Sequence, residues 1–499
     1  MDLLGNLALG FEVALSLQNL LFCFLGALVG TLIGVLPGLG PLATLAMLLP
    51  VTFYLPPIAA LIMLAGIYYG AQYGGSTTAI LVNLPGESSS VVTCLDGYQM
   101  ARNGRAGAAL AVAALGSLFA GTFATFVIAL ASPILGEFAL NFLAAEYFSL
   151  MVLGLVGTIV LARGSMLKAT AMALLGLVIG IVGTDVNSGN QRYTFNITEL
   201  SDGIGFIPVA MGLFAITEIL VNLEQKARRS VSSVVGTLMP TRQEAKAAIP
   251  AILRGTAIGS MLGVLPGGGA MLSSFAAYAL EKKVSRDPSR FGKGAIEGVA
   301  APESANNAGA QTSFIPLLTL GIPSNPVMAI MVGAMMIQGI QPGPQVMTEQ
   351  PKLFWGIIAS MWIGNLMLVI INLPMVGLWV KLLTVPYRWM FPTILLLCSM
   401  GVYGVNNSWV EVGFMAVFGV LGYSFYKLGC EPAPLVLAMI LGPLMEENLR
   451  RALLISRGDP MIFVERPISL TLLLAALVLV LAFILPAMKS TREEAFKES

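Results

Sequence analysis

Hydrophobic residues run in long stretches along this chain, and glycines, prolines and short polar clusters interrupt them. Two of the stretches, residues 106–131 and 468–486, lie near or above the roughly 20 residues that span a hydrocarbon core as a helix. About ten to twelve segments of this kind can be counted along the sequence. The pattern predicts an all-α integral membrane protein.

One apolar segment is broken by GTLIGVLPGLG at residues 30–40, and a near copy, GSMLGVLPGGG, stands at residues 259–269. Seven of the eleven positions are identical, at a separation of 229 residues. The match predicts two related halves that carry the same break. We place repeat 1 at residues 1–222, a basic cytoplasmic connector at 223–254 and repeat 2 at 255–499.

Composition agrees with a bilayer as the solvent. Hydrophobic residues make up 57% of the 499 positions and charged residues only 11%, too few to cover a soluble protein of this size. The net charge of +1 argues against a nucleic-acid partner. The four cysteines have neither metal-ligand nor CxxC spacing and are interpreted as packing residues.

Basic residues predict the orientation, because short loops rich in Lys and Arg stay in the cytoplasm. The first 101 residues contain neither, whereas the stretches 226–246 and 282–293 contain five each. The second break therefore enters from the cytoplasm as a re-entrant hairpin with its tip near 266–270. The first break, with its tip near 37–41, enters from outside. We expect inverted-topology repeats and a periplasmic N-terminus.

The same count of spans places the polar loop 185–203 outside. Beyond residue 425 the count is ambiguous, because two groups of basic residues compete for the inside, and a cytoplasmic C-terminus is favoured. The groups are Arg450, Arg451, Arg457 and Arg466, against Lys489, Arg492 and Lys497.

Broken helices at membrane depth indicate a secondary transporter, since non-helical backbone is tolerated there only inside protein or along a cavity. Pro41 suits the first position of a helix that restarts after the break. The positive N-terminal ends of the restarted helices favour an anion.

Two further stretches, 68–91 and 304–327, combine small polar residues with a second break. In the second of them Asn325 is expected to cap a helix that begins at Pro326. Glu303 is a candidate ion or proton ligand, because carboxylates inside a membrane are costly. A position at the cytoplasmic mouth is the favoured interpretation for Glu303.

Four blocks together resemble the large membrane subunit of bacterial tripartite tricarboxylate transporters. They are GTLIGVLPGLGP, YGGSTTAILVNLPGESSSVVTCLDGYQMAR, GVLPGGGA and PESANNAGAQTSFIPLLTLGIPSNP. The resemblance implies uptake of a citrate-like or other organic carboxylate across the bacterial inner membrane, driven by a sodium or proton gradient. It also implies elevator-type movement, a small four-helix membrane subunit and a periplasmic solute-binding protein as partners. A homodimer is left open.

The substrate and the coupling ion are expected at the tips and at nearby hydroxyls and amides. For the carboxylate the candidates are Gly38, Leu39, Gly40, Gly75, Ser76, Thr77, Gly267, Gly268, Gly269, Ser273, Ser324 and Asn325. For the cation they are Pro37, Asn83, Pro266, Asn306, Asn307 and Thr312. Helix packing or capping is an equally good interpretation for any single Ser, Thr or Asn among them. No cofactor or metal other than the coupling ion is expected.

Two alternatives stay open, an anion channel and an intramembrane enzyme. A channel usually lines its path with a ring repeated by oligomeric symmetry, whereas here the symmetry is within one chain. The chain has no His and no HExxH or GxSxG motif, so we do not expect an enzyme. The lack of His and the small number of expected buried carboxylates favour Na⁺ over H⁺.

Overall fold

The computed structural model describes residues 3–36, 40–139, 141–162, 165–185, 188–224, 237–265, 269–383 and 387–484. The described chain is predominantly helical, as the hydrophobic pattern predicts. The centres of both tips lie outside the described residues. These are Pro37, Gly38 and Leu39 in the first half and Pro266, Gly267 and Gly268 in the second.

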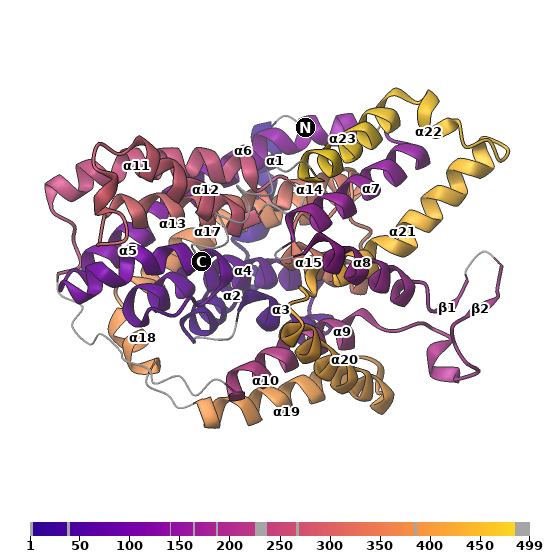
Figure 1. Cartoon of the computed structure of the whole chain (residues 1–499), viewed down its shortest axis with the longest axis horizontal. Helices are drawn as coiled ribbons and strands as arrows, with labels where there is room; N and C mark the ends of the chain where they lie inside the picture. Colours follow the sequence, from indigo (N-terminus) through magenta and orange to yellow (C-terminus); the bar gives the residue numbers. More distant parts are fainter. Residues whose placement is uncertain are drawn as a thin grey trace.

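Helices of the first half follow one another closely along the chain (Figure 1). They are α1 (Leu3–Ala14), α2 (Leu17–Val35), α3 (Pro41–Phe53), α4 (Pro57–Val82), α5 (Val91–Arg102), α6 (Ala106–Ala139), α7 (Ala144–Leu161), α8 (Met166–Gly180), α9 (Phe206–Ala210) and α10 (Thr217–Glu224). Short elements between them are the 3₁₀ turns η1 (Ser88–Ser90) and η2 (Thr198–Leu200) and the π-helical η3 (Met211–Ile216). Strands β1 (Gly183–Thr184) and β2 (Gln191–Arg192) pair antiparallel, with Gly183 opposite Arg192.

Helices continue through the second half. They are α11 (Arg242–Leu262), α12 (Gly269–Val284), α13 (Glu297–Thr312), α14 (Phe314–Leu320), α15 (Pro326–Ile337), α16 (Gln345–Glu349), α17 (Pro351–Asn372), α18 (Val376–Leu382), α19 (Tyr387–Asn406), α20 (Trp409–Lys427), α21 (Ala433–Ile455), α22 (Ile462–Glu465) and α23 (Pro467–Ile484). The 3₁₀ turn η4 spans Pro288–Arg290.

Several helices have the length and composition of membrane spans. Within the described ranges, five qualify in full, namely Leu17–Val35, Ala106–Phe138, Phe206–Glu224, Pro351–Asn372 and Trp409–Lys427. Shorter apolar helices accompany them, among them Pro41–Phe53 and Pro326–Ile337. The chain is a multi-pass membrane protein.

Helix α2, which precedes the first break, packs against α4 through a row of glycines. A β-carbon placed on Gly30 would lie 2.4 Å from the carbonyl oxygen of Ile67, and one on Gly34 would lie 2.4 Å from that of Ala71. Contacts this close require glycine, as in many helix pairs inside membranes. Because the residue numbers rise together on both helices, α2 and α4 run parallel.

The second half repeats this packing at the equivalent motif residues. A β-carbon on Gly259 would lie 2.3 Å from the carbonyl oxygen of Ala305, and one on Gly263 would lie 2.4 Å from that of Gly309. Gly259 and Gly263 stand 229 positions after Gly30 and Gly34. Helices α11 and α13 therefore form a second parallel pair. Pro41 begins α3, as predicted, and Gly40 is its N-cap.

Two groups of helices flank these pairs. Helices α7, α8, α21 and α23 pack on one another, and α20 packs on η3, α9 and α10 (Figure 1). Helices α8 and α21 approach closely, because a β-carbon placed on Gly176 of α8 would lie 2.1 Å from the carbonyl oxygen of Leu435 in α21. The paired β-strands lie at the same end of the molecule as α22 (Figure 1).

Polar contacts sort the helix ends into two sets. In the first set Lys427 Nζ lies 2.5 Å from Glu224 Oε1, Lys168 Nζ donates to the Leu428 carbonyl at 2.6 Å, and Arg105 pairs with Glu244.

In the second set, Arg192 Nη1 lies 2.8 Å from Glu446 Oε2, and Arg450 Nη2 lies 3.1 Å from Asp185 Oδ2. Arg466 pairs with Glu146. The start of α7, the 185–203 loop and the region 446–466 therefore share one end of the molecule.

Candidate functional site

The polar run at 68–79 belongs to a continuous helix and is not itself broken. Every residue of α4 from Ala59 to Val82 is buried, and the break is confined to the residues between Val82 and η1. In the second half, α13 continues to Thr312, and the main break lies between Leu320 and Pro326. The polar side chains of both stretches therefore project from regular helices, α4 and α13.

Hydroxyl groups of these polar runs donate hydrogen bonds to carbonyls at the ends of α2 and α11, which we call the tip helices because each leads into one of the two tips. Thr78 Oγ1 donates to the Val35 carbonyl at 2.7 Å, and Ser313 Oγ lies 3.1 Å from the Gly263 carbonyl. Terminal carbonyls of a helix need such partners wherever water is excluded. The two halves thus close their tip helices by equivalent contacts.

At the first break, glycines let the backbone fold against α2 and α4. A β-carbon on Gly86 would lie 2.2 Å from the Gly34 carbonyl oxygen and 2.5 Å from the α-carbon of Gly75. This packing brings Glu87 against α4, where a β-carbon on Gly75 would lie 2.8 Å from Glu87 Cγ. Gly75 therefore serves the close approach of Glu87.

At the second break, amide and hydroxyl groups organise the chain. Asn325 caps α15, as predicted, because its Oδ1 accepts from the Met328 amide at 3.0 Å. Its Nδ2 donates to Ser313 Oγ at 3.0 Å. Gly269 lies beside this cap with a φ of 59°, and a β-carbon there would lie 3.0 Å from Asn325 Nδ2. The start of α12 and the second break are therefore brought together.

Glu303 of α13 lies in the interior, with its side chain fully buried. Its two carboxylate oxygens accept hydrogen bonds from Ser76 Oγ of α4 and Thr93 Oγ1 of α5. A position at an open cytoplasmic mouth, which the sequence favours, does not fit a side chain with no exposed surface. Glu303 joins the two halves.

Glu87 forms a second carboxylate centre beside the first and is 8% exposed. Asn306 Nδ2 of α13 donates to Glu87 Oε1 at 3.1 Å, and Ser89 Oγ also donates to this oxygen. Ser89 Oγ lies 2.9 Å from both Gln72 Oε1 and Asn306 Oδ1. These contacts extend the polar cluster across both halves.

The cluster holds two carboxylates without a basic partner. Among the described residues, no Lys or Arg forms an ion pair with Glu87 or Glu303. An unpaired buried charge is costly, and hydrogen bonds from neutral groups offset only part of that cost. A cation or a proton is therefore the chemical complement of this cluster.

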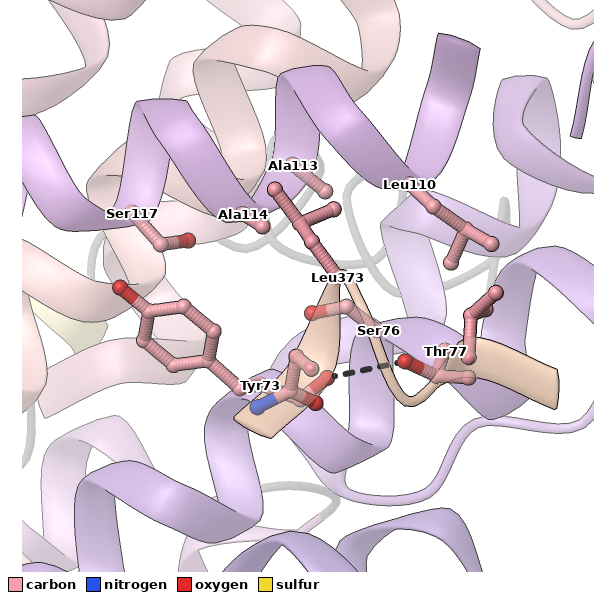
Figure 2. A pocket seen from close by; sticks show the side chains of 10 residues that line it. Tyr73, Ser76, Thr77, Leu110, Ala113, Ala114, Ser117 and Leu373 are labelled. Carbon is pink, nitrogen blue, oxygen red and sulfur yellow. Dashed lines mark hydrogen bonds between the residues drawn. The ribbon is translucent and has the colours of Figure 1, made fainter. Parts of the chain in front are cut away.

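A cavity of about 10 Å³ adjoins Glu303 between α4, α6 and α17 (Figure 2). This volume corresponds to about one water molecule. Tyr73, Ser76, Thr77, Ser117 and Asn372 supply its polar lining. In Figure 2, Tyr73 lies beside Ser117 and Thr77 beside Leu110, so α4 and α6 run antiparallel.

Helix α13, in contrast, runs parallel to α6. Asn307 Nδ2 donates to Ser117 Oγ at 2.7 Å, and further along both helices Thr125 Oγ1 donates to Gln311 Oε1 at 2.6 Å. Residue numbers rise together along this contact. The polar helix of the first half and that of the second therefore point in opposite directions relative to α6.

The predicted site residues fall into separate places. Gly75, Ser76, Thr77, Asn306 and Asn307 lie in or beside the carboxylate cluster and its cavity. Gly269, Ser273, Ser324 and Asn325 gather at the second break, where Ser273 Oγ donates to the Gly269 carbonyl at 2.7 Å and Ser324 Oγ lies 3.4 Å from the Ser313 carbonyl.

Three predicted residues have other surroundings. Thr312 Oγ1 lies 3.0 Å from the Ala308 carbonyl of its own helix and 3.4 Å from the Gly259 carbonyl of α11. Asn83 is exposed and ends α4 with a φ of 58°, a conformation that Asn tolerates. A β-carbon placed on Gly40 would have no neighbouring atom within 4 Å.

Sequence reasoning missed Glu87 and the lining residues Tyr73, Ser117 and Asn372. Glu87 carried a usable signal, since it is a carboxylate directly after a Pro-Gly break in an apolar region. Ser117 and Asn372 carried none, because single polar residues in apolar helices gain meaning only from their neighbours in space. Tyr73 lies within the stretch 68–91 that the sequence analysis singled out, although it was not among the candidates.

Comparison with known families gives one match over most of the chain. The family described as the tripartite tricarboxylate transporter TctA family matches residues 20–437. No solved structure matches this chain.

Two relatives come from Agrobacterium vitis. The "Uncharacterized 52.8 kDa protein in TAR-I ttuC' 3'region" is 58% identical over 499 residues, covering 100% of this chain and 99% of the relative. The "Uncharacterized protein in TAR-II ttuC' 3'region" is 62% identical over 240 residues, which is 48% of this chain and 99% of the relative.

Proposed function

Because the chain belongs to the tripartite tricarboxylate transporter TctA family, we propose that it imports an organic carboxylate across the bacterial inner membrane by cation symport. The family is one of transporters, and it agrees with the resemblance seen in the sequence blocks. The observation that carries the proposal is the buried Glu87–Glu303 cluster, where the polar helices of the two halves meet.

The arrangement of the helix pairs supports alternating access. Two parallel pairs, α2 with α4 and α11 with α13, share the same glycine packing, and their polar helices have opposite directions relative to α6. Inverted repeats around a central site are typical of secondary transporters. Elevator movement would carry these pairs and the cluster against the flanking group α7, α8, α21 and α23.

The two sets of helix ends support a topology for the whole chain. If the basic segment around Glu244 is cytoplasmic, then the start of α6 at Arg105 is cytoplasmic too. The ends at Glu224 and Leu428, which Lys427 and Lys168 contact, are assigned to the same side in this proposal. The opposite set, with Asp185 and Arg450, is then periplasmic. Helix α23 returns from there, which favours a cytoplasmic C-terminus.

Reporter cysteines test this topology in a protein without the four native cysteines. A cysteine at Asn6 or Asp459 should react with an impermeant maleimide added to the periplasmic side, and one at Ser289 only from the cytoplasmic side. Labelling of positions 6 and 289 from the same side would exclude an inverted arrangement.

Transport requires two partners in this proposal, a small four-helix membrane subunit and a periplasmic solute-binding protein. The decisive experiment reconstitutes the two membrane subunits in proteoliposomes and adds the binding protein loaded with a labelled carboxylate. Saturable uptake that needs an imposed Na⁺ or H⁺ gradient is expected. Uptake that follows only the substrate gradient and does not saturate would indicate an anion channel instead.

A further inference from the structure

We propose that the cavity bounded by Tyr73, Ser76, Thr77, Ser117 and Asn372 binds Na⁺, with Glu303 as the counter-charge. The proposal rests on cation-coupled transport as the proposed function and assigns a place to the coupling ion. It includes Asn307 as a neighbouring group and otherwise differs from the site expected from the sequence, which put the cation at the tips and at Asn83, Asn306, Asn307 and Thr312. Two observations independent of the carboxylates support it.

The first is a set of buried oxygen atoms without partners around the cavity. Within the described part of the chain, Tyr73 Oη, Asn372 Oδ1 and the neighbouring Asn307 Oδ1 make no hydrogen bond. Both amides are held in one orientation, because Nδ2 of Asn372 donates to the Leu368 carbonyl at 2.8 Å and Nδ2 of Asn307 donates to the Glu303 carbonyl at 3.1 Å. Their oxygens remain as acceptors, and an acceptor is satisfied by a cation or by a donor.

The second is the size and chemistry of the space. A cavity of about 10 Å³ admits one particle of the size of water, and the polar groups that line it are three hydroxyls, a phenol and an amide. Hard cations prefer oxygen ligands of this kind. A tricarboxylate is far larger than this space, so the carboxylate substrate must bind elsewhere or after the site has opened.

Ser76 couples the cavity to the charge. Its hydroxyl lines the cavity and also donates to a carboxylate oxygen of Glu303. A cation coordinated by the hydroxyl oxygen of Ser76 would be separated from the Glu303 carboxylate by that one hydroxyl group. It would compensate the charge of Glu303. A proton on Glu303 would also neutralise that charge, but it would leave the acceptors Asn372 Oδ1 and Asn307 Oδ1 without a partner.

The test measures ²²Na⁺ binding to the full-length protein in nanodiscs, with choline chloride holding the ionic strength constant. Tyr73→Phe and Asn372→Ala should each raise the Na⁺ concentration for half-saturation by about 10-fold, the effect of one lost ligand. Matched controls lie on the same helices away from the cavity. Tyr69→Phe on α4 and Asn365→Ala on α17 should leave Na⁺ binding unchanged.

Glu303→Gln should lower Na⁺ affinity further, by about 100-fold, because it removes the counter-charge. All variants are first checked for a single monodisperse species, and the conservative Tyr73→Phe keeps the test valid if a larger change unfolds the protein.

Equal Na⁺ affinities in the Tyr73 and Tyr69 variants would overturn the site and leave a structural water as its occupant. Absence of Na⁺ binding together with uptake driven by pH alone would also overturn it. The proposed function fails separately, by absence of gradient-dependent carboxylate uptake, even when Na⁺ binding shifts as expected.

Discussion

The two breaks share one framework and differ in chemistry. In both halves a glycine row presses the tip helix against the polar helix, and a hydroxyl, Thr78 or Ser313, binds the carbonyls where the tip helix ends. At the first break, however, the chain continues into the carboxylate of Glu87. At the second it continues into the neutral amide of Asn325. Equivalent packing therefore supports unequal sites.

The difference shows which part of a repeated motif encodes structure. Gly34 and Gly263 recur because the backbones approach too closely for any side chain. Glu87 contacts Asn306 of the other half, and Asn325 contacts Ser313 of its own half and Tyr68 of the other. The repeat thus supplies the framework, and residues outside the repeated pattern supply the charge.

The largest expected effect tests whether the framework is shared. Gly34→Ala and Gly263→Ala place a β-carbon 2.4 Å from the Ala71 carbonyl oxygen and 2.2 Å from Thr312 Oγ1. Overpacking of this kind costs about 1–3 kcal/mol or more, so both variants should give little folded protein. Size-exclusion chromatography of the solubilised protein measures the folded fraction.

The matched control is the last glycine of the first motif. Gly40→Ala meets nothing within 4 Å, and its φ of −72° suits any residue. It should fold as the wild type does. A normal yield of the Gly34 variant with loss of the Gly263 variant would show that the two pairs are not equivalent.

The second prediction concerns the charge that only the first break carries. Glu87→Gln keeps the shape of the side chain and removes its charge, so the protein should fold while initial carboxylate uptake falls by about 10-fold or more. Asn325→Asp, which keeps the capping acceptor, introduces a charge at the other break. Equal uptake by the wild type and the Glu87 variant would remove the cluster from the transport mechanism.

Much of the framework could be predicted from the sequence, because it rests on local rules. The apolar stretch 106–131 lies within α6, Pro41 and Pro326 start helices, and Asn325 forms the cap that its position predicts. Such features depend on a residue and its chain neighbours. The membrane-protein class and the family also followed from the sequence.

The carboxylate cluster could not be predicted in the same way. Ser76 and Glu303 lie 227 residues apart, and their contact depends on how α4 and α13 pack in the assembled protein. The sequence predicted a second break after small polar residues in the stretches 68–91 and 304–327, but it did not show where α4 and α13 end. Complete burial keeps α4 regular to Val82, since its backbone groups find partners only within the helix.

A smaller effect is expected at the neutral break. Asn325→Ala removes the acceptor for the Met328 amide, and loss of an N-cap costs about 0.5–2 kcal/mol. The melting temperature in detergent should fall, and Asn325→Ser, which retains a capping oxygen, should recover most of it. If serine gives no recovery, the contact of Nδ2 with Ser313 Oγ, and not the cap, stabilises this break.

The smallest effect is expected at a surface carboxylate, which contrasts with the buried ones of the first break. Hydrogen bonds from Arg192 hold the pKa of Glu446 below its ordinary value. A lowered folded pKa stabilises the protein above the unfolded value of about 4.3, and this contribution is lost as the pH falls through the folded pKa. Glu446→Gln should therefore lower stability at pH 7 by less than about 1 kcal/mol, because the pair is partly solvated, and should flatten the acid side of a plot of melting temperature against pH.

Glu447→Gln, which removes only an exposed pair with Arg451, is the matched control and should change neither quantity. A Glu446 variant with an unchanged acid profile would show that the Arg192–Glu446 pair contributes nothing to stability.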